Sequence, residues 1–83
     1  MITQMKLVLY HFEGCPFCKI VRDTINRLEV PEVEYRDILD NSQYKEELIK
    51  MNGIRQVPCL VIDGKPSLES EEIVKFLEDH FGK

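Results

Sequence analysis

The apolar residues of this chain change repeatedly from the spacing of a β-strand to the spacing of an α-helix. Residues 6–10 form a short apolar run with the length and β-branched content of a buried strand. From Pro16 onward the apolar positions recur at helical intervals until Pro31 ends the pattern. The predicted buried stripe is Phe17, Ile20, Val21, Thr24, Ile25 and Leu28, and the opposite, solvated face carries Lys19, Arg22, Asp23, Asn26 and Arg27. Residues 32–37 then alternate with the period of two that is typical of a strand. A strand, a helix and a strand in this order predict two parallel strands joined by a right-handed crossover.

A second helix and a third strand follow in the middle of the chain. Asp40, Asn41 and Ser42 are candidate N-caps for this helix, because their side chains accept hydrogen bonds from free backbone amides. Gly53 ends the helical pattern, as glycine commonly does at a helix C-terminus. Residues 59–62 are strongly apolar and predict a buried strand.

A hairpin and a last helix complete the order of elements. Asp63-Gly64 is a hairpin turn signal, and it predicts that the third strand pairs antiparallel with residues 65–68. Ser70 is the predicted N-cap of the last helix, and Gly82 is its predicted end. The order β-α-β-α-β-β-α therefore predicts a three-layer α/β protein, in which helices flank a mixed four-stranded sheet. This arrangement is similar to the thioredoxin fold.

The size and charge of the chain narrow the class of protein further. Eighty-three residues predict a single domain over residues 1–83, and a hydrophobic fraction of 43% is that of a globular protein. A net charge of −4 argues against a nucleic-acid partner. The first residues lack the features of a secretory signal, and no apolar run is long enough to span a bilayer. We expect a cytoplasmic monomer with no membrane partner.

The pair of cysteines in Cys15-Pro16-Phe17-Cys18 lies where the first strand passes into the first helix. At the predicted N-cap, the unpaired backbone amides and the positive end of the helix dipole favour a thiolate at Cys15. Lys19, one turn further on, adds a positive charge. Cys18 lies on the same face and within reach of a disulfide. We predict that Cys15 is an exposed attacking thiol and that Cys18 is a more buried resolving thiol.

A structural zinc site is the alternative interpretation of this cysteine pair. Such a site takes four ligands, usually from two pairs at short spacing. The other candidate ligands, Cys59, His11 and His80, do not form a second pair, so we expect no metal. Cys59 lies in an apolar strand and is interpreted as a buried hydrophobic residue, and His11 as a solvated loop histidine.

Gln56-Val57-Pro58 stands immediately before the third strand, where a proline disturbs the pairing of a sheet. An ordinary trans proline at a strand entrance would explain it by sequence alone. Beside a reactive cysteine pair in this fold, we instead predict a cis Val57–Pro58 peptide that faces the cysteines. This geometry would leave the backbone of Val57 free to pair with an extended substrate.

Three segments together make the chain resemble the glutaredoxin family over essentially its full length. They are Cys15-Pro16-Phe17-Cys18, Val57-Pro58 and Glu69-Ser70. The C-terminal half, with residues 56–60 followed by 68–73, also looks like the glutathione-binding half of glutathione-transferase-type thioredoxin domains.

The resemblance implies a glutathione site across the last helix and the proline segment. Ser70 would take the α-carboxylate of the γ-glutamyl end through its backbone amide and hydroxyl, and Glu69 or Glu71 would take the ammonium. Val57 would pair with the cysteinyl backbone. Many glutaredoxins meet the glycyl carboxylate with a lysine before the first cysteine, but this chain has Phe12 in that stretch. The other residues that we expect at the ligand are Phe17, Lys19, Gln56 and Pro58, with Arg55 as a further candidate for the glycyl end.

The expected activity is glutathione-dependent reduction of protein disulfides or of glutathionylated thiols, with Cys15 as nucleophile and Cys18 as resolving thiol. Three other functions remain open. One is a redoxin that is recharged by a thioredoxin reductase. Another is an iron–sulfur carrier that holds its cluster between two subunits with Cys15 and two glutathiones. The third is a transferase-like binding domain, against which the second cysteine counts because conjugation does not need it.

Overall fold

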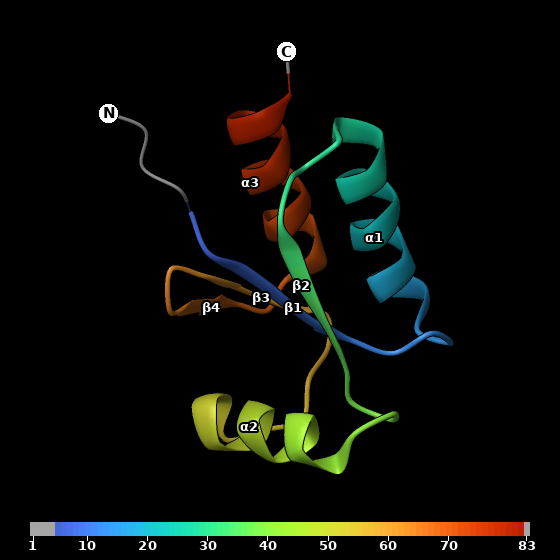
Figure 1. Cartoon of the computed structure of the whole chain (residues 1–83), viewed down its shortest axis with the longest axis vertical. Helices are drawn as coiled ribbons and strands as arrows, with labels where there is room; N and C mark the ends of the chain where they lie inside the picture. The colour runs from blue at the N-terminus through green and yellow to red at the C-terminus, as the bar shows by residue number, and fades with distance from the viewer. Residues whose placement is uncertain (1–4, 83) are drawn as a thin grey trace.

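The computed structural model describes residues 5–82 and confirms the predicted order of elements (Figure 1). The elements are β1 (Leu7–His11), α1 (Pro16–Leu28), β2 (Val33–Asp37), α2 (Ser42–Asn52), β3 (Cys59–Ile62), β4 (Lys65–Ser67) and α3 (Ser70–Phe81). Within residues 5–82, none of these helices combines the length and the apolar character needed to cross a membrane.

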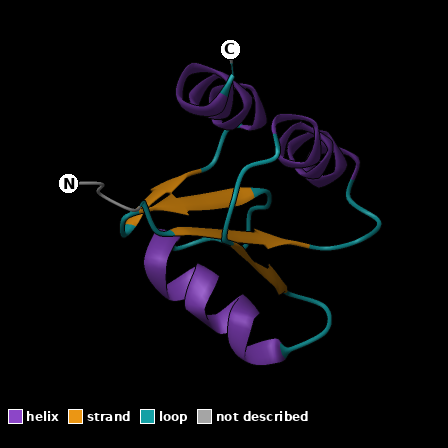
Figure 2. Cartoon of the chain, turned by 45° about the horizontal axis from the view of Figure 1, so that its top comes forward, coloured by secondary structure: helices purple, strands orange, loops and turns teal. Residues whose placement is uncertain are grey.

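The four strands form one mixed sheet in the order β2-β1-β3-β4. Strand β1 pairs parallel with β2 and antiparallel with β3, and β4 pairs antiparallel with β3. Figure 2 shows α1 and α3 on one face of the sheet and α2 on the other. The predicted three-layer α/β architecture with a parallel pair and a hairpin is therefore confirmed.

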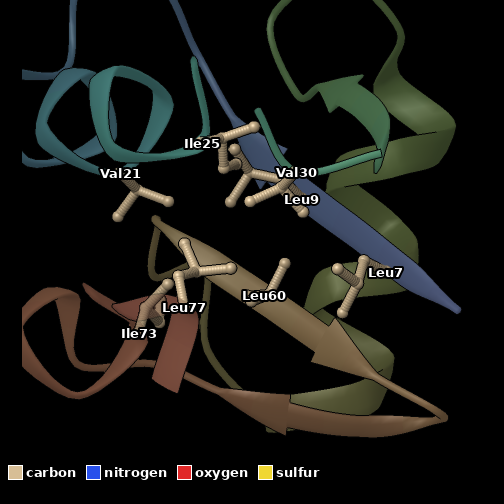
Figure 3. Packing of buried hydrophobic residues seen from close by; sticks show 8 residues of the cluster. All are labelled: Leu7, Leu9, Val21, Ile25, Val30, Leu60, Ile73 and Leu77. Carbon is tan, nitrogen blue, oxygen red and sulfur yellow. The ribbon is translucent and has the colours of Figure 1, made fainter. Parts of the chain in front are cut away.

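The larger core lies between the sheet and the helices α1 and α3. Leu7 and Leu9 of β1 point to this face, because alternate residues of a strand share a face. Figure 3 shows how they pack with the apolar side chains of the two helices and of the neighbouring strand. The other members of the cluster in that view are Val21, Ile25, Val30, Leu60, Ile73 and Leu77.

A smaller core lies under α2 on the opposite face. Val8 and Tyr10, the alternate residues of β1, pack there with Leu48 of α2 and with Cys59 of β3. Because both faces of β1 are covered, all five of its residues are buried. Strand β1 is therefore central within the sheet, between β2 and β3, and also central between the two helical layers.

A polar network joins α2 to the sheet at the edge of the smaller core. The guanidinium of Arg36 in β2 donates hydrogen bonds to the Tyr10 hydroxyl and to the Glu47 carboxylate of α2, both at 2.8 Å. The Tyr10 hydroxyl donates to the same Glu47 oxygen, also at 2.8 Å. Arg36 also lies over the rings of Tyr10 and Tyr44, 5.5 Å from each centroid. These contacts supplement the one fully buried apolar residue that α2 contributes.

The structure tests the predicted N-caps of α2 and α3. Asn41 is the N-cap of α2, and its side-chain oxygen accepts from the Gln43 amide at 2.9 Å. For α3, however, the prediction of Ser70 as N-cap is wrong, because Ser70 is the first helical residue. Glu69 has the extended conformation of a cap, and its carbonyl accepts from the Ile73 amide at 2.9 Å. The strand boundaries differ by a single residue, since β1 extends to His11 and β4 ends before Leu68.

We predict that Leu60→Ala lowers the free energy of unfolding by about 2–5 kcal/mol, because the side chain has no exposed surface and its loss leaves a cavity. Leu39→Ala is the matched control, since that leucine is 71% exposed and should change stability by less than about 0.5 kcal/mol. Urea unfolding followed by circular dichroism measures both. Equal losses in the two variants would contradict this account of the core.

Candidate active site

The reactive cysteines are positioned by the end of the central strand and the start of α1. After His11 the chain turns, and the Cys15 amide donates to the Phe12 carbonyl at 3.2 Å. Cys15 has the extended backbone of an N-cap, with φ −83° and ψ 117°, and Pro16 occupies the first turn of the helix. The predicted placement of Cys15 at the helix N-terminus is confirmed.

The two sulfur-bearing residues are joined across the first turn of α1. The Cys15 Sγ accepts a hydrogen bond from the Cys18 backbone amide at 3.3 Å, so the sulfur acts as the capping group of the helix. Cys18 has no exposed surface, whereas Cys15 is 7% exposed. Their order of accessibility agrees with the prediction, but Cys15 is buried rather than exposed.

The thiol of Cys18 has a higher pKa than an ordinary thiol because it is buried. Removal from water, together with its hydrogen bond to Cys15, raises the pKa of Cys18 to about 12. Cys18 therefore stays protonated at neutral pH while Cys15 is reduced. Because a thiolate and not a thiol attacks a disulfide, Cys18 is poorly suited to a first attack. The remaining thiol of the pair, Cys15, is also the one with access to solvent.

The peptide bond between Val57 and Pro58 is cis, as predicted. Within the described residues, no hydrogen bond uses the backbone amide or carbonyl of Val57. The Gln56 side-chain amide donates to the Leu68 carbonyl at 3.3 Å and so ties this segment to the start of α3.

A groove of about 190 Å³ lies between this proline segment, the first turn of α1 and the start of α3. Six of the eight residues predicted at the ligand line it, so the fold brings together segments from three distant parts of the sequence. The lining residues are Phe17, Gln56, Val57, Pro58, Leu68, Glu69 and Ser70.

A second, more apolar groove of about 300 Å³ shares Phe17 and Ser70 with the first and adds Glu71, Val74 and Ile20. The sequence pattern placed Ile20 on the buried stripe of α1, but its side chain is 49% exposed. The same pattern placed Phe17 mainly in the core, with partial exposure expected from its position between the cysteines, and its side chain is 59% exposed. Both side chains face the start of α3 rather than the sheet, which explains why the helical period alone misplaced Ile20.

The start of α3 presents backbone donors without a side-chain cap. Glu69, the N-cap residue, makes no side-chain capping hydrogen bond. The amides of Ser70 and Glu71 lie in the first helical turn, where no intrahelical acceptor is available to them. This end of the helix carries partial positive charge and suits a carboxylate. The side chains of Glu71 and Glu72 add negative charge beside it, which suits an ammonium.

Lys19 is not brought into either groove. Its ammonium lies 2.7 Å from the Asp23 carboxylate one turn further along α1, and both side chains are mostly exposed. The contact of Lys19 with a ligand stays a prediction, as does the residue that meets the glycyl end.

The sequence analysis misplaced one residue beside the cysteines and gave no role to another. His11 is 5% exposed at the end of β1, so its interpretation as a solvated loop histidine is wrong; the strand continues one residue further than its apolar run. Arg22 of α1 donates to His11 Nδ1 at 3.1 Å and to the carbonyls of Phe12 at 3.2 Å and Glu13 at 3.4 Å. The signal available in the sequence was the spacing of four between Cys18 and Arg22, which places both on one helix face.

The third cysteine has no exposed surface, which confirms its interpretation as a buried residue. Burial raises the pKa of Cys59, and the Asn52 amide donates to its sulfur at 3.6 Å. Across residues 5–82, no three side chains of histidine, cysteine, aspartate or glutamate gather as a set of metal ligands.

The mixed sheet, the cysteine pair at a helix N-terminus and the adjacent cis-proline define a protein of the thioredoxin-like class. A solved thioredoxin-like protein of similar size has the same fold, with a TM-score of 0.71 at 23% identity over 87% of this chain and 99% of that chain. The sequence model of the glutaredoxin family matches residues 7–66. The chain belongs to the glutaredoxin family.

Glutathione transferases are also similar to this chain. Glutathione S-transferase 1 of Manduca sexta is 34% identical over 80 residues, which are 94% of this chain and 37% of the transferase. Prostaglandin E synthase 2 of Danio rerio is 32% identical over 72 residues, covering 87% of this chain and 18% of the synthase. A solved glutathione transferase homologue from Drosophila mojavensis, with bound glutathione, has a TM-score of 0.80 and 27% identity over 96% of this chain and 37% of its own. The chain thus spans well under half the length of these relatives.

We predict that a maleimide at neutral pH modifies Cys15 of the native protein and leaves Cys18 and Cys59 unmodified. Cys15 alone of the three has exposed surface, and burial keeps the other two protonated. Mass spectrometry of the digested protein identifies the labelled peptides, and labelling in guanidinium chloride is the control in which all three react. Labelling of Cys18 as fast as Cys15 in the native protein would contradict the assigned order of access.

Proposed function

We propose that the chain is a glutathione-dependent thiol–disulfide oxidoreductase in which Cys15 is the nucleophile and Cys18 the resolving thiol. The observation that carries the proposal is the Cys15 sulfur at the N-terminus of α1, hydrogen-bonded to the Cys18 amide. The groove beside the pair runs from the cis-proline to the uncapped start of α3. The membership of the glutaredoxin family supports the same chemistry.

The first step is a thiol–disulfide exchange at Cys15. Its thiolate attacks the glutathione sulfur of a mixed disulfide, a new bond forms between the two sulfurs, and the bond to the substrate sulfur breaks. The substrate leaves as a thiolate and takes a proton from water. The Cys18 amide donates to the Cys15 sulfur and so holds the nucleophile at the N-terminus of α1. A second glutathione thiolate then attacks the glutathione sulfur of the Cys15–glutathione disulfide, which releases glutathione disulfide and restores the Cys15 thiolate.

Protein disulfides require the second cysteine. After Cys15 has formed a mixed disulfide with a protein substrate, Cys18 gives its proton to solvent and attacks the Cys15 sulfur. The Cys15–Cys18 disulfide forms, the substrate thiolate leaves, and two glutathiones later reduce the pair. In the reduced protein, the hydrogen bond to Cys15 and the charge of Cys15 both raise the pKa of Cys18. Both effects disappear once the Cys15 sulfur is in a disulfide, so the resolving thiol becomes easier to ionise at the moment when it is needed.

The groove supports a position for the glutathione half of the substrate. The unpaired backbone of Val57 suits the cysteinyl residue in an extended conformation. The free amides at the start of α3 suit the γ-glutamyl carboxylate, and the acidic side chains of Glu69 and Glu71 suit its ammonium. This placement puts the glutathione sulfur toward the cysteine pair, because Phe17 between the two cysteines lines the same groove.

We predict that Cys15→Ser reduces deglutathionylation of a mixed-disulfide peptide to the uncatalysed rate, because it removes the attacking sulfur. Cys18→Ser should keep this activity but lose the reduction of a protein disulfide, which needs the resolving thiol. An assay coupled to glutathione reductase measures both activities. Cys59→Ala is the matched control and should retain both, since Cys59 is buried away from solvent.

Full activity in Cys15→Ser would show that the proposal is wrong. Turnover with a thioredoxin reductase but not with glutathione would identify a redoxin of another kind.

We predict that Ser70→Pro weakens glutathione binding by about tenfold or more, because it removes a backbone donor to a carboxylate. Proline is tolerated at the first helical position, and the extended conformation of Glu69 is compatible with a following proline. Ser70→Ala keeps the amide and should bind glutathione within about threefold of the wild type. Calorimetric titration of glutathione, with Cys15→Ser as the background, measures binding without reaction. Unchanged binding in Ser70→Pro would place the γ-glutamyl end elsewhere.

A second candidate function is glutathione conjugation, which the similarity to the transferase of Manduca sexta favours. In that reaction the thiolate of glutathione attacks an electrophile, and no thiol of the protein changes its oxidation state. Conjugation of an aryl chloride that persists in Cys15→Ser and Cys18→Ser would support this candidate over the oxidoreductase. The presence of the buried second cysteine favours the oxidoreductase, since conjugation has no step for it.

A further inference from the structure

One cation contacts the segment that leads into the reactive cysteines. Arg22 of α1 donates hydrogen bonds to three consecutive residues, at His11 Nδ1, the Phe12 carbonyl and the Glu13 carbonyl, over distances of 3.1 to 3.4 Å. The planar guanidinium offers several donors in a rigid arrangement, which a lysine does not. The segment between β1 and α1 is therefore held to the body of the helix that follows it.

The same carbonyl is shared by Arg22 and by the reactive cysteine. The Phe12 oxygen accepts from the Cys15 amide at 3.2 Å and from Arg22 at 3.2 Å. Arg22 is thus one hydrogen-bonded group away from the Cys15 backbone. Without the guanidinium, the Phe12 carbonyl would keep only the Cys15 amide as a donor, and the carbonyl that orients Cys15 would be held less firmly.

The charge of Arg22 is not neutralised by its partners. Its acceptors are two carbonyls and His11, and in the described part of the chain it forms no ion pair with a carboxylate. Because the guanidinium is always a donor, His11 Nδ1 must be an acceptor and the imidazole neutral.

The surroundings of His11 favour this neutral form. Burial and the charge of Arg22 lower its pKa, and they outweigh the carboxylates of Asp37 in β2 and Glu13 in the loop, which raise it. The ring of Tyr35 packs against its edge, 5.6 Å between centroids.

Cys18 and Arg22 are four residues apart on α1, so they lie one turn apart on the same helix face. The three hydrogen bonds hold the positive charge of Arg22 against the loop of Cys15, and the charge also acts on the thiol of Cys18. We propose that Arg22 is a positioning residue for the cysteine pair, which holds the Cys15 loop through Phe12 and Glu13 and stabilises the Cys18 thiolate in the resolving step. The inference rests on the proposed oxidoreductase function.

The electrostatics of Cys18 agree with this geometry. Burial dominates and raises its pKa, while a backbone hydrogen bond from Phe12 and, more weakly, the charge of Arg22 lower it. When Cys15 has entered a mixed disulfide, burial still opposes ionisation of Cys18. Arg22 then remains as a fixed cation that favours the thiolate in a poorly solvated place.

The test uses two substitutions that separate the two roles of Arg22. Arg22→Lys keeps the charge but loses the three-way contact, and Arg22→Met loses both. We predict that both variants slow deglutathionylation by about tenfold, because the Cys15 loop is no longer held. Arg22→Met should slow the Cys18-dependent step by about a further tenfold at neutral pH, whereas Arg22→Lys should not.

Stopped-flow measurement of glutathione release from the Cys15–glutathione disulfide reports the Cys18 step directly. In the wild type and in Arg22→Lys, the rate should rise with pH over the same range. In Arg22→Met the rise should move to higher pH, because the Cys18 thiolate has lost its nearby cation. A merely structural role of Arg22 would leave this pH profile unchanged.

Two controls separate these effects from lost stability. Arg27→Met removes an exposed cation of the same helix, whose partner is Glu78 at 2.8 Å, and should leave both rates unchanged. Ile25→Val lowers stability from within the core of α1 without touching the loop, and it should also keep both rates. Wild-type rates in Arg22→Met, or an equal loss in Ile25→Val, would overturn the inference. Absence of glutathione-dependent activity in the wild type would instead overturn the proposed function.

Discussion

The burial of β1 on both of its faces determines where every group of the candidate site lies. Four of its five residues, from Leu7 to Tyr10, alternate between the two cores, and its neighbours β2 and β3 hold it from both sides. A strand so constrained ends at a defined point, and the loop after it delivers Cys15 to the start of α1. The antiparallel pairing of Tyr10 with Cys59 brings the cis-proline segment to the same end of the sheet.

Cys15 and Cys18 differ in exposure to solvent because they lie at different depths at the start of α1. Cys15 caps the helix and keeps some contact with solvent, whereas Cys18, one turn deeper, has none. Ionisation of the deeper thiol is unfavourable because the charge would be removed from water, and this raises the pKa of Cys18 to about 12. In the proposed reaction, the order in which the two sulfurs act thus follows from their depth in the fold, because both are cysteine thiols.

The order of elements and the position of the cysteine pair could be predicted because they depend on local patterns. Apolar spacing, turn residues and a proline in the first helical turn act within a few residues of one another. Features that depend on contacts between elements were missed. Ile20 follows the helical period but faces the start of α3, and His11 is buried by the extension of β1. The cap of α3 lies at Glu69 rather than Ser70, and Arg22 looked like one more surface charge.

The contacts of Cys18 differ from those of a cysteine that only fills the core, and this difference supports the resolving role proposed for it. Cys59 offers the comparison within the same chain, since it is equally buried and its neighbours are an asparagine amide and the smaller core. Cys18 instead hydrogen-bonds to a second sulfur and lies on the helix face of an arginine whose charge no carboxylate balances in the described part of the chain. A small apolar side chain would fill either position equally well. Only at Cys18 do the surroundings supply both a partner for a disulfide and a cation for the thiolate that forms it.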